Sequence, residues 1–164
     1  MIWPVIQLFL LTFVPFVELR LAIPLGILGG SLTLPFGIVI SGLSLHPMYV
    51  FLVCISANFM LAVILYIILY YIDGLLRRSF MHGRYAKLRD KSKARLEKFT
   101  KKYGAIGLAL FIAIPLPGSG VYMGTLGAFV LGLERKKFLI ASAIGVTLAG
   151  AIVTILTITG MSIF

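Results

Sequence analysis

The fold is decided by one stretch, Phe16-Val17-Glu18-Leu19-Arg20-Leu21-Ala22-Ile23-Pro24-Leu25-Gly26, which sets two charges inside apolar sequence. Apart from Glu18 and Arg20, no Asp, Glu, Lys or Arg residue precedes Asp73. A charged side chain inside a membrane is costly, so it usually faces a partner and marks a functional site. Pro24 and Gly26 follow at once and favour an interruption of the helix. The stretch therefore predicts a charged pair at a broken helix within a membrane.

Composition assigns the whole chain to the membrane class. Hydrophobic residues make up 60% of the 164 residues and charged residues 12%, whereas soluble domains have about 25% charged residues. The apolar runs are continuous rather than alternating, which favours helices over strands. We therefore predict an all-α integral membrane protein with a single multi-pass domain over residues 1–164, located in the cell membrane.

The net charge of +10 is concentrated in two segments. Most of the 15 basic residues lie in residues 77–102, and three more form Arg135-Lys136-Lys137. Basic segments that flank apolar spans are typical of the cytosolic side of a membrane. We therefore expect both segments to be cytosolic, with residues 77–102 in contact with anionic lipid headgroups and not with nucleic acid. An apolar stripe in residues 73–103 predicts an amphipathic linker helix in the plane of this interface.

Two apolar segments are long enough to cross a membrane. Residues 36–72 exceed what one span needs, and His46-Pro47 divides them, which leaves a transmembrane helix at 48–72. A final span is predicted over residues 138–164.

The apolar residues 104–133 lie between the two basic segments and surround the run Ile114-Pro115-Leu116-Pro117-Gly118-Ser119-Gly120. A single crossing here would put the basic segments on opposite sides, whereas a re-entrant hairpin keeps both in the cytosol. Prolines near the N-terminus likewise predict a hairpin at about 4–34, in which two half-length helices meet near residues 15–24.

The two predicted hairpins resemble each other. Pro15 and Pro24 bracket the charged pair, and Pro115 and Gly124 lie 100 residues further along. Small residues recur at every fourth position after each break, which permits close helix packing and leaves a homodimer open. The predicted span at 48–72 completes the first half (1–72) and lies between its hairpin and the hairpin of the second half (104–164). The hairpins are therefore expected to enter from opposite faces, as in the inverted-topology repeats of transporters.

Two motifs carry a resemblance to a known family. The chain resembles the small multidrug export proteins over about residues 8–158, through Glu18-Leu19-Arg20-x-Ala22-Ile23-Pro24-Leu25-Gly26 and Ala113-Ile114-Pro115-Leu116-Pro117-Gly118-Ser119-Gly120-Val121-Tyr122-x-Gly124. That family is distantly similar to the DedA or VTT superfamily. The resemblance implies opposed re-entrant hairpins, drug export and, from the wider superfamily, translocation of lipids such as polyprenyl phosphates. Residues 115–124 lack the arginine of the usual DedA pattern, so only Arg20 remains for phosphate binding.

The hairpin tips form the predicted substrate and proton-coupling site. Its candidate residues are Glu18, Arg20, Pro24, Asn58, Pro115, Pro117, Gly118, Ser119, Gly120, Tyr122 and Thr125. Glu18 is a candidate proton carrier, because burial disfavours a charged carboxylate and a nearby guanidinium favours it. Arg20 is a candidate for binding an anionic headgroup, assisted by amides at helix N-termini. The alternative is a permanent ion pair that locks the hairpin, which needs an extended chain because residues i and i+2 of a helix point apart.

Several functions stay open at this stage. The sequence argues against an enzyme and against a cofactor or metal, because it has no cluster with metal-ligand spacing and no nucleophile beside a base. The main hypothesis is a transporter for an amphipathic small molecule or lipid, with proton coupling as an option. The alternatives are a flippase or scramblase for a phosphorylated lipid such as a polyprenyl phosphate, and a non-transporting membrane scaffold. For Asn58, Ser119, Tyr122 and Thr125, helix packing or backbone bonding is the alternative role.

Overall fold

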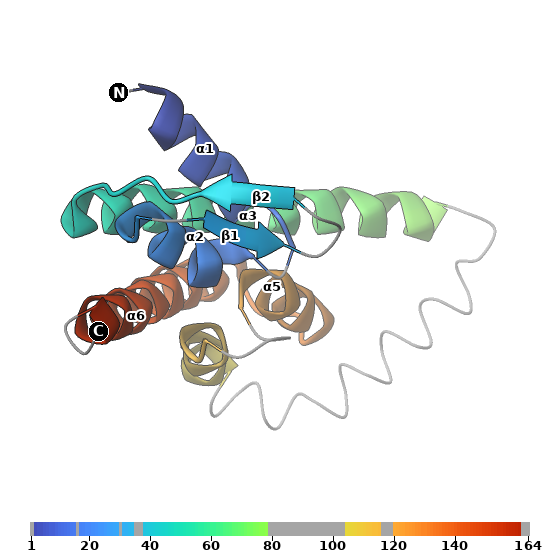
Figure 1. Ribbon diagram of the computed structural model, residues 1–164. Helices are drawn as coiled ribbons and strands as arrows, with labels where there is room; N and C mark the ends of the chain where they lie inside the picture. The colour runs from blue at the N-terminus through green and yellow to red at the C-terminus, as the bar shows by residue number, and fades with distance from the viewer. Residues whose placement is uncertain are drawn as a thin grey trace.

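The protein was analysed as a computed structural model, which describes residues 2–15, 17–29, 31–34, 38–78, 104–115 and 120–161. In chain order these form α1 (Ile2–Thr12), α2 (Glu18–Ile27), β1 (Ser31–Leu34), β2 (Ile38–Ser41), α3 (Pro47–Arg78), an unlabelled helix (Gly104–Ala113), α5 (Val121–Val130) and α6 (Arg135–Met161). The predicted helical class is confirmed, with the addition of one short two-stranded ribbon (Figure 1).

Helices α3 and α6 are long and apolar enough to cross a membrane, over Pro47–Leu75 and Arg135–Gly160. Only 28% and 39% of their most apolar windows are buried, whereas the apolar helix of a soluble protein would be buried in its core. Their exposed leucine and isoleucine side chains need an apolar solvent, so this is a membrane protein. The helix predicted at 48–72 is confirmed and begins at Pro47, a favoured first position for proline. The last helix begins at Arg135 and not at residue 138 as predicted, so the basic triplet forms its first turn.

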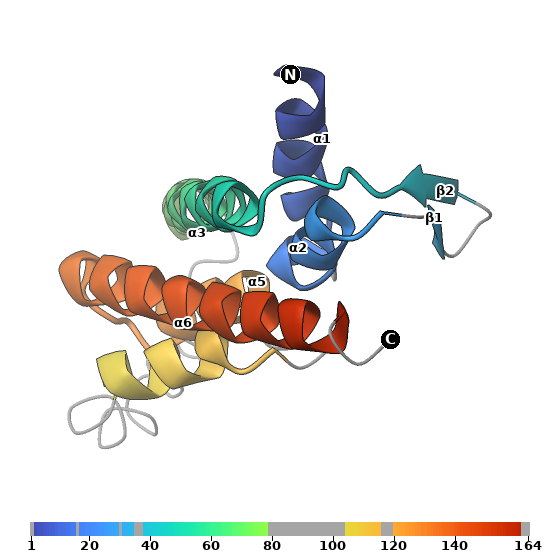
Figure 2. The same cartoon turned by 60° about the vertical axis from the view of Figure 1, so that its left-hand side comes forward.

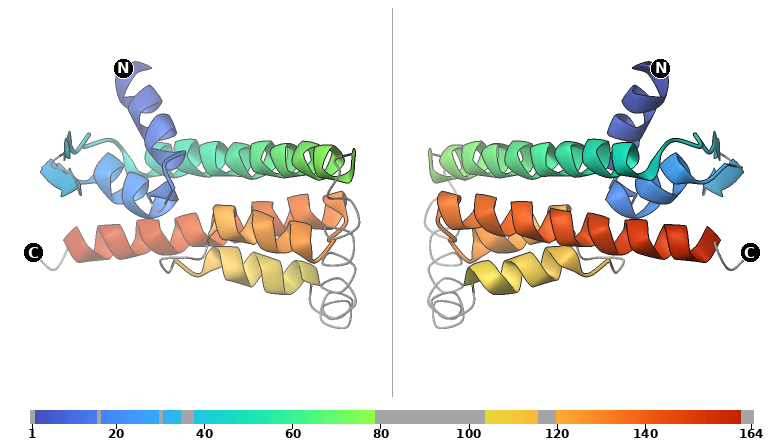
Figure 3. Two further views of the ribbon diagram at one scale, coloured as in Figure 1. Left: turned by 90° about the vertical axis from the view of Figure 1, so that its right-hand side faces the viewer. Right: turned by 90° about the vertical axis from the view of Figure 1, so that its left-hand side faces the viewer.

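The two long helices run antiparallel, with the end of α3 beside the start of α6 (Figure 3). At that end the ring of Tyr66 stacks on Phe138, with 4.7 Å between ring centroids. Further along, Gly150 packs so closely on Ile55 that an added Cβ would lie 3.0 Å from its Cγ1. The basic residues at the end of α3 and at the start of α6 consequently lie at one end of the bundle, which we call the basic end.

Helices α1 and α2 form a pair whose connecting turn lies between Thr12 and Glu18 (Figures 1 and 2). The prediction of a break near residues 15–24 is therefore wrong in its second half, because Pro24 lies inside α2. A proline removes one backbone hydrogen bond, and this short helix continues without it. The carbonyls of Leu25 and Gly26, near the end of α2, accept the backbone N–H groups of Leu43 and Leu45 at 2.9 Å.

The antiparallel ribbon β1–β2 pairs Ser31 with Ser41 and Leu34 with Ile38. The ribbon is absent from the prediction, which places residues 31–34 in the N-terminal hairpin and residues 36–41 in the apolar stretch before the long helix. Each strand is short, and the ribbon extends away from the helices (Figure 2).

The helix Gly104–Ala113 and α5 are the second pair of short helices. A Cβ on Gly124 would lie 2.6 Å from Cγ1 of Ile112, and one on Gly145 of α6 would lie 2.8 Å from the carbonyl oxygen of Ala109. Glycine therefore lets the three helices approach closely. The expected linker helix at 73–103 is not separate at its start, because α3 continues to Arg78, and its remainder lies outside the described residues.

Candidate functional site

Helices α2 and α5, from opposite halves of the chain, meet at their N-termini. The backbone N–H of Tyr122, in the first turn of α5, donates to Oε1 of Glu18 at 3.4 Å, and the backbone of Val121 also interacts with this carboxylate. The residue before α5, Gly120, has no side chain that could cap the helix. Glu18 thus supplies the anion that a helix N-terminus favours, from a position 104 residues away in the chain.

Gly120 allows both charged side chains to approach the start of α5. Its φ is 101°, a backbone conformation that favours glycine. A Cβ at this position would collide with Oε2 of Glu18 and would lie 3.0 Å from Nη2 of Arg20. The carboxylate and the guanidinium therefore converge on one point of the Gly120 backbone, and their charges attract each other.

The backbone of Glu18 explains how residues two positions apart converge. Glu18 begins α2 with a φ of 40°, which is outside the helical range and unfavourable for a residue with a side chain. The sequence argument that i and i+2 point apart holds only on a regular helix, and this local conformation departs from one. The sequence argument also held that Glu18 and Arg20 could interact directly only if the chain were extended there. That condition is wrong, because the two side chains approach each other from the start of a helix, with a positive φ at Glu18.

Tyr122 makes a second connection between the two halves. Its hydroxyl group donates a short hydrogen bond to the backbone carbonyl of Phe13, in the turn that precedes Glu18. Each half thus uses a side chain to bind the backbone of the other half. The Glu18 side chain binds the backbone of α5, and the Tyr122 side chain binds the backbone of the α1–α2 turn. We call these two contacts the tip latch.

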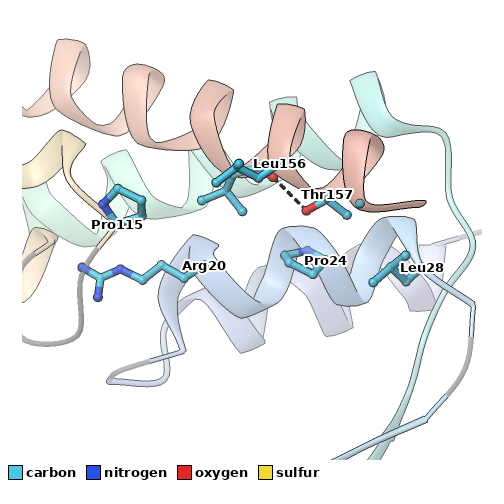
Figure 4. A pocket seen from close by; sticks show the side chains of 8 residues that line it. Arg20, Pro24, Leu28, Pro115, Leu156 and Thr157 are labelled. Carbon is cyan, nitrogen blue, oxygen red and sulfur yellow. Dashed lines mark hydrogen bonds between the residues drawn. The ribbon is translucent and has the colours of Figure 1, made fainter. Parts of the chain in front are cut away.

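A cavity of about 700 Å³ opens beside the tip latch, between α2 and α6 (Figure 4). Its lining comprises Arg20, Pro24, Leu28, Pro115, Val153, Leu156, Thr157 and Gly160. Figure 4 shows the guanidinium of Arg20 at one end, near Pro115, with Pro24 and Leu28 along the wall. The hydroxyl of Thr157 donates to the carbonyl of Val153 at 2.7 Å. Most of the described lining residues are apolar, and Arg20 is the charged residue among them.

The other predicted site residues are divided between this region and the helix interior. Pro24 and Pro115 line the cavity, whereas Pro117, Gly118 and Ser119 lie outside the described residues. Thr125 is fully buried and donates to the carbonyl of Val121 at 2.7 Å, which matches the alternative of backbone bonding.

Asn58 lies 1% exposed on α3, and its Oδ1 finds no hydrogen-bond partner among the described residues. Within the same residues, no group of three His, Cys, Asp or Glu side chains could hold a metal ion.

Sequence reasoning missed the contribution of α6 and of the Phe13 carbonyl. The α6 face consists of Val153, Leu156, Thr157 and Gly160. Threonines and glycines recur along the whole of α6, so the sequence does not single out this face. The carbonyl of Phe13 is a backbone group, so no residue type marks it.

Comparison with known proteins identifies the family of the chain. No curated protein and no solved structure matches it. A family model matches residues 18–152. This range includes most of α6 and, apart from Phe13, all residues of the tip latch. The name of this family indicates a role in export across a membrane, in agreement with the apolar surfaces of α3 and α6. The chain belongs to the family described as "Putative small multi-drug export protein".

Proposed function

We propose that the protein is a membrane transporter whose substrate binds in the cavity beside Arg20. The observation that carries this proposal is an apolar cavity of about 700 Å³ with a guanidinium at the point where two short helices meet. A cavity of this volume suits a small ligand, and its apolar walls with one charged group suit an amphipathic molecule. An anionic group would pair with Arg20 while the apolar part contacts Leu28 and Leu156.

The contacts of α2 support one arm of a re-entrant hairpin in the first half, whereas α1 points away from the long helices (Figure 3). A Cβ on Gly26 would lie 2.6 Å from Val50, near the start of α3, and 3.0 Å from Leu8 of α1. From Gly26 back to Glu18, α2 extends about 12 Å, which brings Glu18 close to the middle of a ~30 Å apolar core. The N-terminal hairpin, predicted at about 4–34, would thus enter from the face opposite the basic end.

The second half supports a hairpin of opposite direction. The helix Gly104–Ala113 and α5 are each about 15 Å long, which is half of an apolar core. Both basic segments then lie on the cytosolic face, as the positive-inside rule requires. Two opposed hairpins whose helix ends meet near the midplane form an inverted-topology repeat, a common architecture for transporter sites.

Proton coupling is supported by the position of Arg20, which lines the cavity and also lies beside Glu18 at Gly120. A substrate anion bound to Arg20 would offset its positive charge, so Glu18 would take up a proton more readily. A protonated Glu18 is a weaker acceptor for the α5 N–H groups, so the tip latch would weaken. Substrate binding and proton uptake would therefore favour the same opened state, which is the linkage that coupled transport needs.

A scaffold that transports nothing is the alternative from another class. The burial of Glu18, which is 5% exposed, favours a permanent lock between the hairpins. The side chain of Arg20, however, lines a cavity that a purely structural pair would not need. Within the transporter class, the cavity suits a phosphorylated lipid as well as an amphipathic drug.

The experiment compares two cargoes in proteoliposomes, a fluorescent phosphatidylglycerol and the cationic dye ethidium. Arg20→Gln should lower lipid translocation by about tenfold or more, since a hydrogen bond to a charged group contributes about 1.5–3 kcal/mol. Lys136→Gln removes the same charge from an exposed position at the basic end and should have little effect. If Arg20→Gln transported the lipid and the dye at the same rates as wild type, the role of Arg20 would be refuted. If wild type transported neither cargo, the scaffold would be favoured.

A further inference from the structure

A second cavity, of about 500 Å³, lies at the basic end of the bundle. Its lining comprises Tyr66, Ile67, Tyr70 and Tyr71 of α3 and Arg135 of α6. It shares no residue with the cavity beside Arg20, and the proposed transport does not require it. Three tyrosines and an arginine around one cavity are an unusual combination for the lipid-facing part of a membrane helix.

The depth of this cavity corresponds to the edge of the membrane. Tyr66 lies about 28 Å along α3 from Pro47, so the tyrosines that follow reach the end of a ~30 Å apolar core. Tyrosine is enriched at this level because its ring is apolar and its hydroxyl is polar. The cavity is therefore expected to lie among the lipid headgroups of one leaflet.

Arg135 gives the cavity its charge. It is the first residue of α6, whose first intrahelical contact is the N–H of Phe138 with the carbonyl of Glu134 at 2.9 Å. The N–H groups before Phe138 therefore have no acceptor within the helix, and they add positive potential at this point. Lys137 lies 3.6 Å from the carboxylate of Glu134. Among the described residues, Arg135 is the cation that lines the cavity.

The three tyrosines line the side of the cavity formed by α3. The ring of Tyr66 is stacked on Phe138 at an interplanar angle of 19°, which connects α3 to α6 beside Arg135. Tyr70 and Tyr71 are 67% and 68% exposed, and their rings form an edge-to-face pair at 6.3 Å. Their hydroxyl groups can donate hydrogen bonds to a headgroup, and the exposed Ile67 and Ile68 offer an apolar path for acyl chains.

We propose that this cavity is a binding site for an anionic phospholipid of the leaflet at the basic end. The phosphate is held by the guanidinium of Arg135, whose fork of donors fits phosphate oxygens, and the tyrosine hydroxyls contact the phosphate and glycerol oxygens. The acyl chains lie along α3. Charge complementarity selects the anionic headgroup, and the position at the membrane edge selects a lipid over a phosphate ion from solution. This proposal depends on the membrane location of α3 and α6 and is independent of transport.

Native mass spectrometry of the full chain in detergent tests the proposal, with phosphatidylglycerol and phosphatidylcholine as probes. Wild type should retain phosphatidylglycerol preferentially. One basic residue near a membrane surface contributes about 1 kcal/mol of unspecific attraction, or about fivefold, so Arg135→Gln should lose clearly more than fivefold in affinity. Lys136→Gln removes the same charge from the same helical turn and is the matched control, with a loss of at most about fivefold.

Arg135→Lys separates a built site from diffuse attraction, because it keeps the charge and removes the fork of donors. A lower affinity of Arg135→Lys for phosphatidylglycerol supports the site, as does a further loss in Tyr70→Leu. The proposal would be overturned if Arg135→Lys bound phosphatidylglycerol as tightly as wild type does and if Arg135→Gln and Lys136→Gln lost equal affinity for it. Displacement of the lipid by millimolar inorganic phosphate, with the same dependence on Arg135, would assign the cavity to a free anion and would also overturn the proposal.

Discussion

The carboxylate of Glu18 accepts the backbone N–H of Tyr122 at 3.4 Å and so caps a helix that begins about a hundred residues later in the chain. A helix cap is usually local, since the capping side chain belongs to the residue just before the helix. Here Gly120 occupies that position, and the cap comes from the other half of the protein. A single ionisable group therefore joins the stability of α5 to the contact between the two halves.

Replacement of Gly120 by alanine should break the tip latch. The new Cβ would collide with the Glu18 carboxylate in a backbone conformation that disfavours a side chain, so we expect a destabilisation of about 2 kcal/mol or more. Thermal unfolding in detergent measures it. Gly127→Ala is the matched control, because a Cβ there meets nothing within 4 Å and alanine favours a helix. Similar melting temperatures for the two variants would contradict the latch.

Glu18→Gln should abolish the response of transport to a pH gradient. The amide still accepts a hydrogen bond from Tyr122, so the loss of stability should be only about 1 kcal/mol, from the missing charge at the α5 N-terminus. Transport in proteoliposomes with imposed gradients of either direction measures the response. Glu134→Gln, which changes an exposed acid at the basic end, should leave the response intact. Full gradient-driven transport by Glu18→Gln would end the proton-carrier hypothesis.

Tyr122→Phe should loosen the turn between α1 and α2. It removes the hydroxyl that donates to the carbonyl of Phe13 and should cost about 1 kcal/mol. Hydrogen exchange of the turn amides should become faster, while exchange within α3 should stay the same. Tyr49→Phe removes an exposed hydroxyl at the start of α3 and serves as the control. Unchanged exchange in the turn of Tyr122→Phe would show that this contact does not hold the two halves together.

Gly160→Phe should block transport without harming the fold. Gly160 lines the cavity beside Arg20, and a Cβ there meets nothing within 4 Å, so the new ring can occupy the cavity. Translocation of the fluorescent lipid in proteoliposomes should fall severalfold at an unchanged melting temperature. Gly107→Phe adds the same ring at another open position, outside the cavity, and should transport normally. Equal transport by both variants would exclude the cavity as the substrate site.

The sequence by itself determined the class of the protein, the positions of its long helices and the charged pair. Hydropathy is a local and nearly additive property, so continuous apolar sequence predicts a membrane helix wherever it occurs. The helix predicted at 48–72 was confirmed on this basis, although it begins one residue earlier, at Pro47, and continues to Arg78. Glu18 and Arg20 were conspicuous because charges are costly in apolar surroundings, wherever the chain folds.

Only the tertiary structure decided what the charged pair contacts. The φ of 40° at Glu18, the position of the break before Glu18 and the regular helix through Pro24 depend on packing that no local pattern records. Gly120 looked like one of several glycines in a predicted turn, and its role became visible only when the distant carboxylate and guanidinium were seen to meet on its backbone. The face that α6 contributes to the cavity is likewise a product of helix packing, because the small and hydroxyl residues that pack helices in lipid occur on several sides of α6.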